Sequence, residues 1–97
     1  MQLLPDRLRK NHFDYTIVHR GNRSFVYRQD VYPNLAYYEV FRKKIEKERV
    51  MFGKTVPEHE RFPSDESFGD WAWSYREYKD AMKKFNEIEN EPIKSES

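Results

Sequence analysis

The 97-residue sequence contains no cysteine and only three glycines. Without cysteine the chain can form no disulfide, no thiolate metal site and no thiol nucleophile, and this composition fits a reducing compartment. No apolar run approaches the roughly 20 residues that a membrane-spanning helix needs. We therefore expect a cytoplasmic protein that does not enter a membrane and that folds without metal ions or covalent cross-links.

The sequence is instead rich in aromatic and charged residues, at 16% and 36%. A chain of this length makes one domain with a thin core. Large rings enlarge such a core, because each can bury roughly 150–250 Å². The aromatic content also argues against a disordered chain, since disordered segments are poor in rings.

Charge is divided unevenly along the chain. Residues 1–50 contain eleven Lys and Arg against six Asp and Glu, whereas residues 51–97 contain seven against eleven. This split predicts either an ordinary dipolar surface or a basic sheet face that meets an acidic partner or a nucleic acid.

Residues 13–20 and 23–29 alternate between apolar and polar side chains, which predicts two β-strands. Gly21-Asn22 between them suits a tight turn. A three-residue loop over residues 20–22 would place Ile17 opposite Phe25 and Tyr15 opposite Tyr27. We therefore predict a hairpin in this register.

The segment over residues 36–47 fits two structures. Its apolar residues recur at helical spacing, but the run Tyr-Tyr-Glu-Val-Phe over residues 37–41 is typical of a strand. We choose a strand, because an isolated hairpin needs a third strand to be stable. The pattern leaves open whether Val40 or Phe41 points into the core.

Residues 52–69 read as a long ordered loop, which Phe62 and Phe68 hold against the sheet. Trp71, Trp73 and Tyr75 follow at alternate positions and predict a short strand with one aromatic face. The pattern does not show which tryptophan is buried.

Apolar residues at helical spacing then predict an amphipathic helix that begins near Arg76 and ends at Asn90 and Pro92. These residues are Tyr78, Ala81, Met82, Phe85 and Ile88.

These elements predict an α+β fold, in which a small antiparallel sheet of about four strands packs against one C-terminal helix. The expected organisation is an N-terminal arm (residues 1–12), a single domain (residues 13–90) and a flexible tail (residues 91–97). The predicted core consists of one tryptophan together with Tyr15, Ile17, Phe25, Tyr27, Val40, Ala72, Tyr78, Ala81, Met82, Phe85 and Ile88.

No motif indicates catalysis, a cofactor or a metal. The three histidines lack the i, i+3 or i, i+4 spacing of a helical metal site. Residues 52–55, Phe-Gly-Lys-Thr, lack the upstream glycine of a phosphate-binding loop and read as a turn. We therefore expect a protein that is not an enzyme and has no cofactor.

The pattern that remains is a set of basic side chains near rings, which can follow a phosphate backbone or meet an acidic surface. The candidate binding residues, for protein or nucleic acid, are Arg20, Arg23, Arg28, Arg42, Lys43, Lys47, Phe62, Phe68, Trp71 and Trp73.

A longer pattern combines Gly53-Lys54, Pro57, Glu-Arg-Phe-Pro at residues 60–63, Asp65-Glu66, Phe68-Gly69, Ala72-Trp73 and the helix around residues 81–85. This pattern resembles a group of small uncharacterised proteins from bacteria and their phages. The resemblance covers roughly residues 37–88, supports the predicted strands and closing helix, and implies no known activity.

The function that this sequence favours is a small non-enzymatic protein-binding accessory module, encoded by a phage or mobile element and acting on a host protein. The alternative is a nucleic-acid-binding module that uses a basic β-hairpin face.

Overall fold

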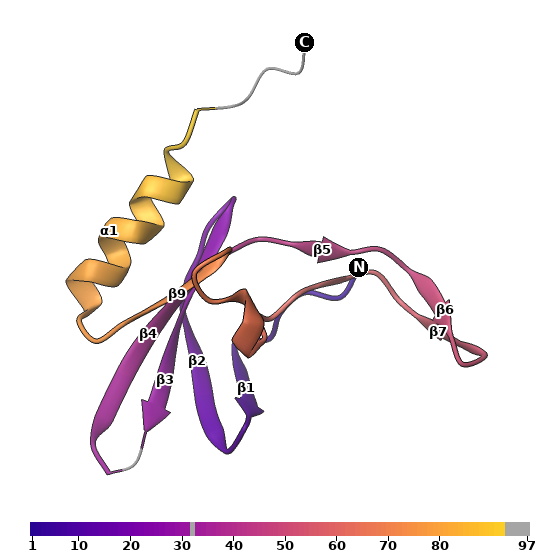
Figure 1. Ribbon diagram of the computed structural model, residues 1–97, viewed down its shortest axis with the longest axis horizontal. Helices are drawn as coiled ribbons and strands as arrows, with labels where there is room; N and C mark the ends of the chain where they lie inside the picture. The colour runs from indigo at the N-terminus through magenta and orange to yellow at the C-terminus, as the bar shows by residue number, and fades with distance from the viewer. Residues whose placement is uncertain (32, 93–97) are drawn as a thin grey trace.

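The computed structural model describes residues 1–31 and 33–92. They form a five-stranded antiparallel sheet and one helix, which follows the last strand in the sequence, so the predicted α+β fold is confirmed (Figure 1). The sheet order is β1-β2-β3-β4-β9. The bounds are β1 (Arg7–Lys10), β2 (Phe13–Arg20), β3 (Ser24–Val31), β4 (Leu35–Arg42), β9 (Ala72–Tyr75) and helix α1 (Tyr78–Glu89).

The fifth strand comes from the predicted N-terminal arm. Residues of β1 pair with β2, so that Leu8 lies opposite Tyr15. Leu4, which precedes β1, is only 8% exposed and belongs to the hydrophobic core. Residues 1–12 are therefore part of the folded domain, which corrects the boundary that we placed at residue 13.

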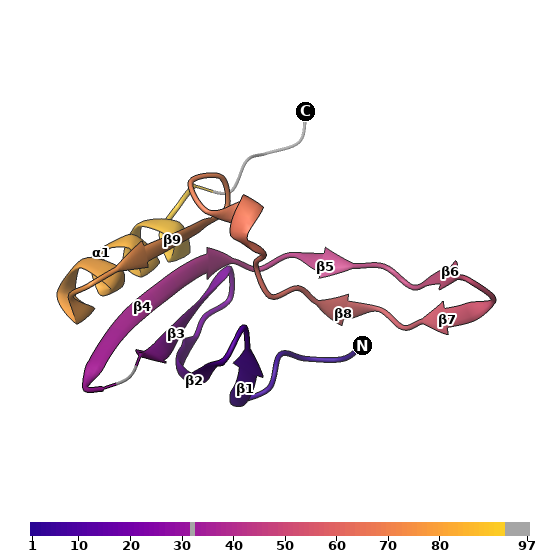
Figure 2. The ribbon, with the colours of Figure 1, turned by 60° about the horizontal axis from the view of Figure 1, so that its bottom comes forward.

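The segment between β4 and β9 carries a long hairpin that projects from the sheet (Figure 2). Its inner part pairs β5 (Ile45–Glu46) with β8 (His59–Glu60), and its outer part pairs β6 (Arg49–Met51) with β7 (Lys54–Val56). We call residues 43–61 the β-finger. A short 3₁₀ helix, η1 (Asp65–Ser67), follows before β9.

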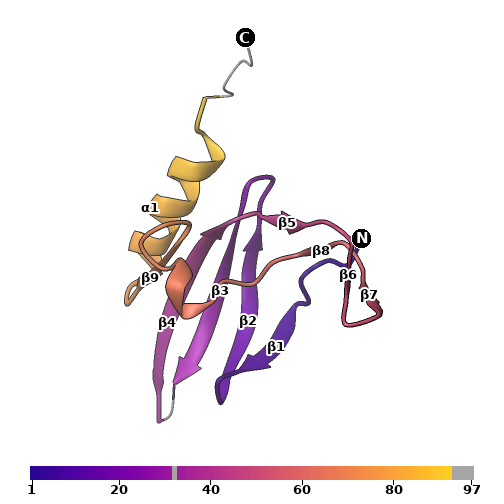
Figure 3. The ribbon, with the colours of Figure 1, turned by 45° about the vertical axis from the view of Figure 1, so that its right-hand side comes forward.

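Apolar side chains are buried on both faces of the sheet. Helix α1 packs on one face against β3, β4 and β9 (Figure 3). The other face is covered by Leu4, Phe62 and Phe68. The helix-side core contains Val26, Val40, Ala81 and Ile88. The loop-side core contains Leu4, Tyr15, Phe25, Tyr27, Phe41, Trp71 and Ala72.

The two-sided core corrects the single core that the sequence suggested. Val40 and Phe41 are both fully buried, on opposite faces of β4. Trp71 is buried in the loop-side core, whereas Trp73 packs against the helix-side core. Tyr78 is 43% exposed and was wrongly assigned to the core.

The hairpin of β2 and β3 forms as predicted, but in a different register. Ile17 lies opposite Tyr27 and Tyr15 lies opposite Gln29, two positions away from the prediction. The register shifts between Ile17 and His19, where Val18 forms a bulge and packs toward the helix side. A bulge adds one unpaired residue, which no alternation pattern reveals.

The turn between β2 and β3 is held by the end of the helix. The carboxylate of Glu89 accepts hydrogen bonds from the backbone N–H groups of Asn22 and Arg23, at 2.8 and 2.9 Å, and from the Ser24 hydroxyl at 2.6 Å. Burial disfavours the charge of Glu89, but these hydrogen bonds outweigh burial and lower its pKa. A Cβ at Gly21 would lie 2.6 Å from the Glu89 carboxyl, so a larger residue there would displace the carboxylate that holds the turn.

The chain after the helix is also anchored. The Arg42 Nη2 atom lies 2.7 Å from Glu91 Oε2, and Arg23 donates to the Glu91 carbonyl oxygen. The hydrogen bond from Arg42 lowers the pKa of Glu91. The predicted flexible tail therefore does not begin at residue 91, and residues 93–97 lie outside the described residues.

Substitution of Ile88 tests the helix-side core. Ile88 is 1% exposed, so Ile88→Ala should lower the free energy of unfolding by about 2–5 kcal/mol through lost contacts and a cavity. The exposed Lys83 provides the control, and Lys83→Ala should change it by less than about 0.5 kcal/mol. Chemical denaturation measures both, and equal effects would contradict this helix orientation.

Candidate functional site

The outer hairpin of the β-finger ends in a two-residue turn, Phe52-Gly53, that follows the pair Met51–Lys54. Both turn residues have positive φ, at 51° and 74°. This is the pattern of a type I′ turn, which matches the right-handed twist of the strands that it joins. The sequence segment around Gly53-Lys54 is thus a hairpin turn.

The tip of the β-finger (residues 50–53) is apolar and exposed. Phe52 is 96% exposed, Val50 74% and Met51 37%. Single exposed apolar residues are ordinary, but a contiguous group marks an interaction surface in a folded protein. Within the described residues, three more of the large exposed apolar side chains lie on the β-finger or on the N-terminal segment that pairs with it: Met1, Leu3 and Ile45.

Phe52 is an unfavourable residue for this turn. The preferred pair is Asn-Gly, and a bulky side chain at positive φ costs roughly 1–2 kcal/mol. The ring is almost fully exposed, so packing does not offset this cost. The residue thus lowers the stability of the hairpin while presenting a large apolar group to the solvent.

The base of the β-finger is fixed to the sheet by the buried carboxylate of Glu60. Its Oε1 atom accepts a hydrogen bond of 2.8 Å from the backbone N–H of Leu4. Arg20 Nη1 approaches the same oxygen at 3.3 Å, and Lys43 Nζ lies 3.9 Å from Oε2. Arg20 also donates to the Leu4 carbonyl oxygen at 2.6 Å. One carboxylate therefore joins the β-finger, the N-terminal segment and β2.

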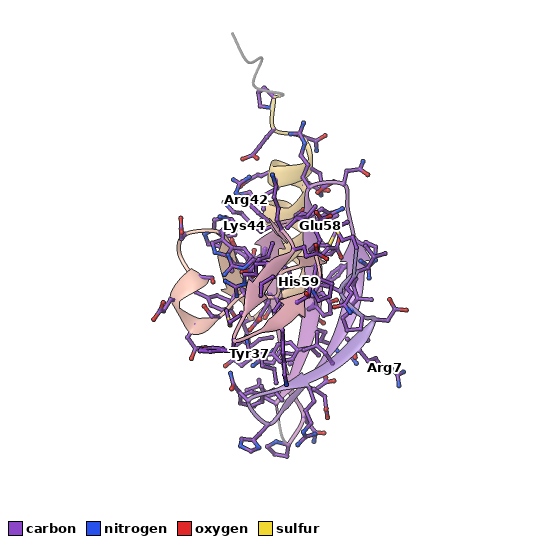
Figure 4. All side chains as sticks on the ribbon, turned by 90° about the vertical axis from the view of Figure 1, so that its right-hand side faces the viewer. Arg7, Tyr37, Arg42, Lys44, Glu58 and His59 are labelled. Atoms are coloured by element: carbon purple, nitrogen blue, oxygen red, sulfur yellow. The ribbon has the colours of Figure 1, made fainter. Side chains whose placement is uncertain are left out.

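The N-terminal segment pairs with the inner part of the β-finger through an isolated parallel bridge between Gln2 and His59. Gln2 donates its N–H to the Glu58 carbonyl and accepts a hydrogen bond from the Glu60 N–H, at 2.8 and 2.9 Å. Glu46 gathers Arg49, His59 and Arg61 within 3.7 Å. Figure 4 looks along the β-finger toward the sheet and labels Glu58 and His59 on this part. These contacts brace the inner part, whereas the tip has none of this kind among the described residues.

The residues around the tip are mainly basic. Lys47, Arg49 and Lys54 are exposed, and Glu48 is the one acidic residue between positions 47 and 56. Arg49 is paired with Glu46 at 3.1 Å, but its side chain remains 50% exposed. The apolar tip is thus bordered by positive charge.

The basic residues predicted from sequence do not form one binding face. Arg20 and Lys43 bind Glu60, and Arg42 and Arg23 bind Glu91. Arg28 is exposed and pairs with Asp30 at 3.1 Å. Of the six, Lys47 alone lies near the tip. Four of these cations therefore connect segments that are distant in the sequence, and the structure does not bring the six together on one face.

The predicted binding aromatics are also structural. The Phe62 ring lies 5.0–5.4 Å from the rings of Tyr15, Tyr27 and Phe41. Phe68 packs beside it, and Trp71 is buried. The ring of Trp73 lies under Lys84 Nζ, 4.1 Å from its centroid. The surplus of rings in this region therefore fills the loop-side core and covers its margin.

Sequence reasoning missed the apolar tip. The available signal was a Phe-Gly turn between two short β-prone triplets, Arg-Val-Met and Lys-Thr-Val. That pattern indicates a hairpin but not its exposure, because exposure depends on whether another segment covers it.

A second polar feature lies at the centre of the loop side. Glu39 of β4 is only 6% exposed and lines a cavity of about 90 Å³ beneath the loop that carries Phe62 and Phe68. Lys10 reaches the edge of this cavity, where its Nζ atom donates to the Pro63 carbonyl at 2.8 Å. The remaining lining residues are Asn11, Phe13, Tyr15, Gln29, Pro63 and Asp65.

Burial raises the pKa of Glu39 from 4.5 to about 7, against the opposing influence of Lys10 and with a further rise from Asp65. Burial also raises the pKa of Tyr15 to about 12, and the negative charge of Glu39 adds to that rise. A charged Glu39 is thus disfavoured in the folded protein.

No family model matches the chain, and neither the curated proteins nor the solved structures contain a significant match. The helix that the structure describes is too short and polar to cross a lipid bilayer. Residues 1–31 and 33–92 contain no group of three or more His, Asp or Glu side chains placed to hold a metal ion. The resemblance seen in residues 37–88 stays a prediction.

Removal of the Glu60 carboxylate tests the base of the β-finger. Glu60→Ala should lower the free energy of unfolding by about 2–4 kcal/mol, because it leaves two cations and the Leu4 N–H without their acceptor. Chemical denaturation measures this loss. Glu58→Ala, at an exposed neighbouring position, should cost less than about 0.5 kcal/mol. A comparable loss in both variants would contradict the role of Glu60.

Glu39 should make stability depend on pH. Its folded-state pKa of about 7 lies above the ordinary value of 4.5 for a glutamate in the unfolded chain, so the contribution of Glu39 to the free energy of unfolding is fully present below pH 4.5. This contribution is lost as pH rises toward 7, by about 3 kcal/mol in total. Lys10, Tyr15, Tyr27 and Asp65 are the other titratable groups around it. Denaturation from pH 4.5 to 8 measures the effect, and Glu39→Gln should abolish this part of the dependence.

Proposed function

We propose that this protein is a small non-enzymatic protein-binding module that docks on its partner through the tip of the β-finger. The observation that carries the proposal is the exposed group of Val50, Met51 and Phe52 at the end of a projecting hairpin. Aromatic residues that enter a pocket on the partner commonly dominate binding energy. The Phe52 ring has the position and exposure for that role.

The conformational cost at Phe52 also supports a binding role for this residue. A residue held at positive φ lowers stability, and such strain concentrates at binding and catalytic sites. Asparagine would fit the turn better and would keep the tip polar. Phenylalanine at this position is accounted for by a contact with another molecule.

The surroundings of the tip define the chemistry of the partner. Lys47, Arg49 and Lys54 border the apolar group, so the complementary surface is an apolar pocket with an acidic rim. The resemblance to bacterial and phage proteins makes a bacterial host protein the first partner to test.

The nucleic-acid alternative has less support. It requires free cations along the hairpin of β2 and β3, whereas Arg20 and Arg23 are engaged by Glu60 and Glu91. At the tip, Lys47, Arg49 and Lys54 are exposed, but Phe52 is the one exposed ring beside them that could stack on a base. A mixed-sequence oligonucleotide is therefore the comparison ligand for the experiment below.

Phe52→Asn separates binding from folding. The change should leave the free energy of unfolding unchanged or raise it by about 0.5–1 kcal/mol, because asparagine tolerates positive φ. It should weaken partner binding by roughly 30-fold or more if the ring is the main anchor. Capture from bacterial lysate by wild type and variant, followed by titration of the captured protein, measures binding.

Tyr78→Ser is the matched control, since it removes a half-exposed ring on helix α1, away from the β-finger. It should leave capture unchanged. Equal capture by wild type and Phe52→Asn would overturn the proposal. Salt-sensitive binding to the oligonucleotide with no captured protein would favour the alternative.

A further inference from the structure

The cavity beneath the loop over residues 62–68 carries a net negative charge when its acids are ionised. Glu39 and Asp65 contribute two carboxylates, and Lys10 contributes one ammonium group. The net charge of the lining is therefore −1 when Glu39 is ionised, and the exposed Asp65 shares its charge with solvent. It lies on the loop side of the sheet, apart from the tip of the β-finger.

The Glu39 carboxylate has no partner of its own. Among the described residues, neither a hydrogen bond nor an ion pair within 4.0 Å engages its oxygens, although the residue is only 6% exposed. No fully buried side-chain polar atom of the described residues lacks a hydrogen bond, so the Glu39 oxygens reach the solvent that enters the cavity. Buried carboxylates in folded proteins are normally hydrogen-bonded or paired. The volume of about 90 Å³ beside it corresponds to roughly three water molecules at about 30 Å³ each.

The walls of the cavity restrict what can fill it. The rings of Phe13, Phe62 and Phe68 provide apolar surface, and a ring face attracts a cation. The uncharged polar side chains of the lining are those of Asn11, Tyr15 and Gln29. Gln29 Nε2 donates a hydrogen bond of 2.9 Å to Tyr15 Oη. Gln29 Oε1 and the Glu39 oxygens remain as acceptors. A small cation with both N–H groups and methyl groups satisfies all of these surroundings.

The chain already places a group of this kind at the edge of the cavity. The Lys10 ammonium group lies 5.2 Å from the centroid of the Phe62 ring and donates to Pro63. An alkylammonium ion is thus compatible with these walls, and Lys10 opposes the entry of a second cation. We propose that this cavity binds a small N–H-bearing alkylammonium group, whose ammonium donates to Glu39 and whose methyl groups contact the phenylalanine rings.

The test uses dimethylammonium chloride as the probe and the full chain at about pH 8.5, where Glu39 is ionised and the amine is still protonated. Amide chemical shifts of Tyr15, Gln29, Glu39 and Asp65 report binding, and the side-chain amide of Gln29 reports it directly. Sodium chloride at equal ionic strength and propan-2-ol, a neutral molecule of similar shape, are the control ligands. A probe of three heavy atoms should bind with a Kd on the order of millimolar or weaker.

Two variants give opposite expectations. Glu39→Gln removes the charge but keeps the shape, and should weaken binding by about tenfold or more. Lys10→Met removes the competing cation and should strengthen binding by about threefold or more. Phe52→Asn should bind the probe as wild type does, so that this inference and the proposed function can fail separately.

The same titration separates two sources of the group. A short peptide with one dimethyl-lysine tests a protein side chain, whereas the free amine tests a small metabolite-like ligand. Binding of either, with the expected response to Glu39→Gln, supports the proposal. Absence of shifts in both wild type and Lys10→Met, or equal shifts in Glu39→Gln, would overturn it.

Discussion

The side chains of β3 and β4 are apolar on both faces of the sheet, and such strands must be covered on both sides. Phe25, Tyr27 and Phe41 face one way, and Val26 and Val40 face the other. Helix α1 alone could cover one face only. The chain therefore uses Leu4 and the loop around Phe62 to cover the second face, which brings the N-terminal segment and the loop before β9 onto the same face of the sheet.

The uneven distribution of charge follows from this arrangement. Basic residues of the first half meet acidic residues of the second half when the chain folds, as Arg20 meets Glu60 and Arg42 meets Glu91. These contacts join segments that are 40 and 49 residues apart. Part of the charge split thus serves contacts between the two halves of the chain, which engage Arg20, Arg42 and Lys43.

The β-finger and the Glu39 cavity differ from the rest of the molecule in the same respect. Each contains a residue whose conformation or surroundings lower the stability of the folded protein. Phe52 has a positive φ and an exposed ring, and Glu39 has a carboxylate in a largely buried position without a hydrogen-bond donor. No fully buried side-chain polar atom of the described residues lacks a hydrogen bond, so the Glu39 oxygens, which accept none, are open to the solvent in the cavity. A bound molecule can stabilise the folded protein at such sites, because it can bury the exposed ring or donate hydrogen bonds to the carboxylate.

The sequence by itself determined the elements that depend on local pattern. Alternation predicted β2, β3 and β9, and the strand choice for residues 36–47 was confirmed over β4. Helical spacing predicted α1 and its end at Asn90. These features depend on neighbours within a few residues, so a single sequence carries the information for them.

Tertiary structure alone decided the remaining features. The bulge at Val18 shifted the hairpin register, and coverage of the second sheet face made a strand of residues 7–10. The candidate site was not predicted, because Val50 and Phe52 in sequence resemble any apolar residues that a fold could bury. Whether a residue is buried depends on segments that are distant in the sequence, and the local pattern of apolar and polar residues does not identify those segments.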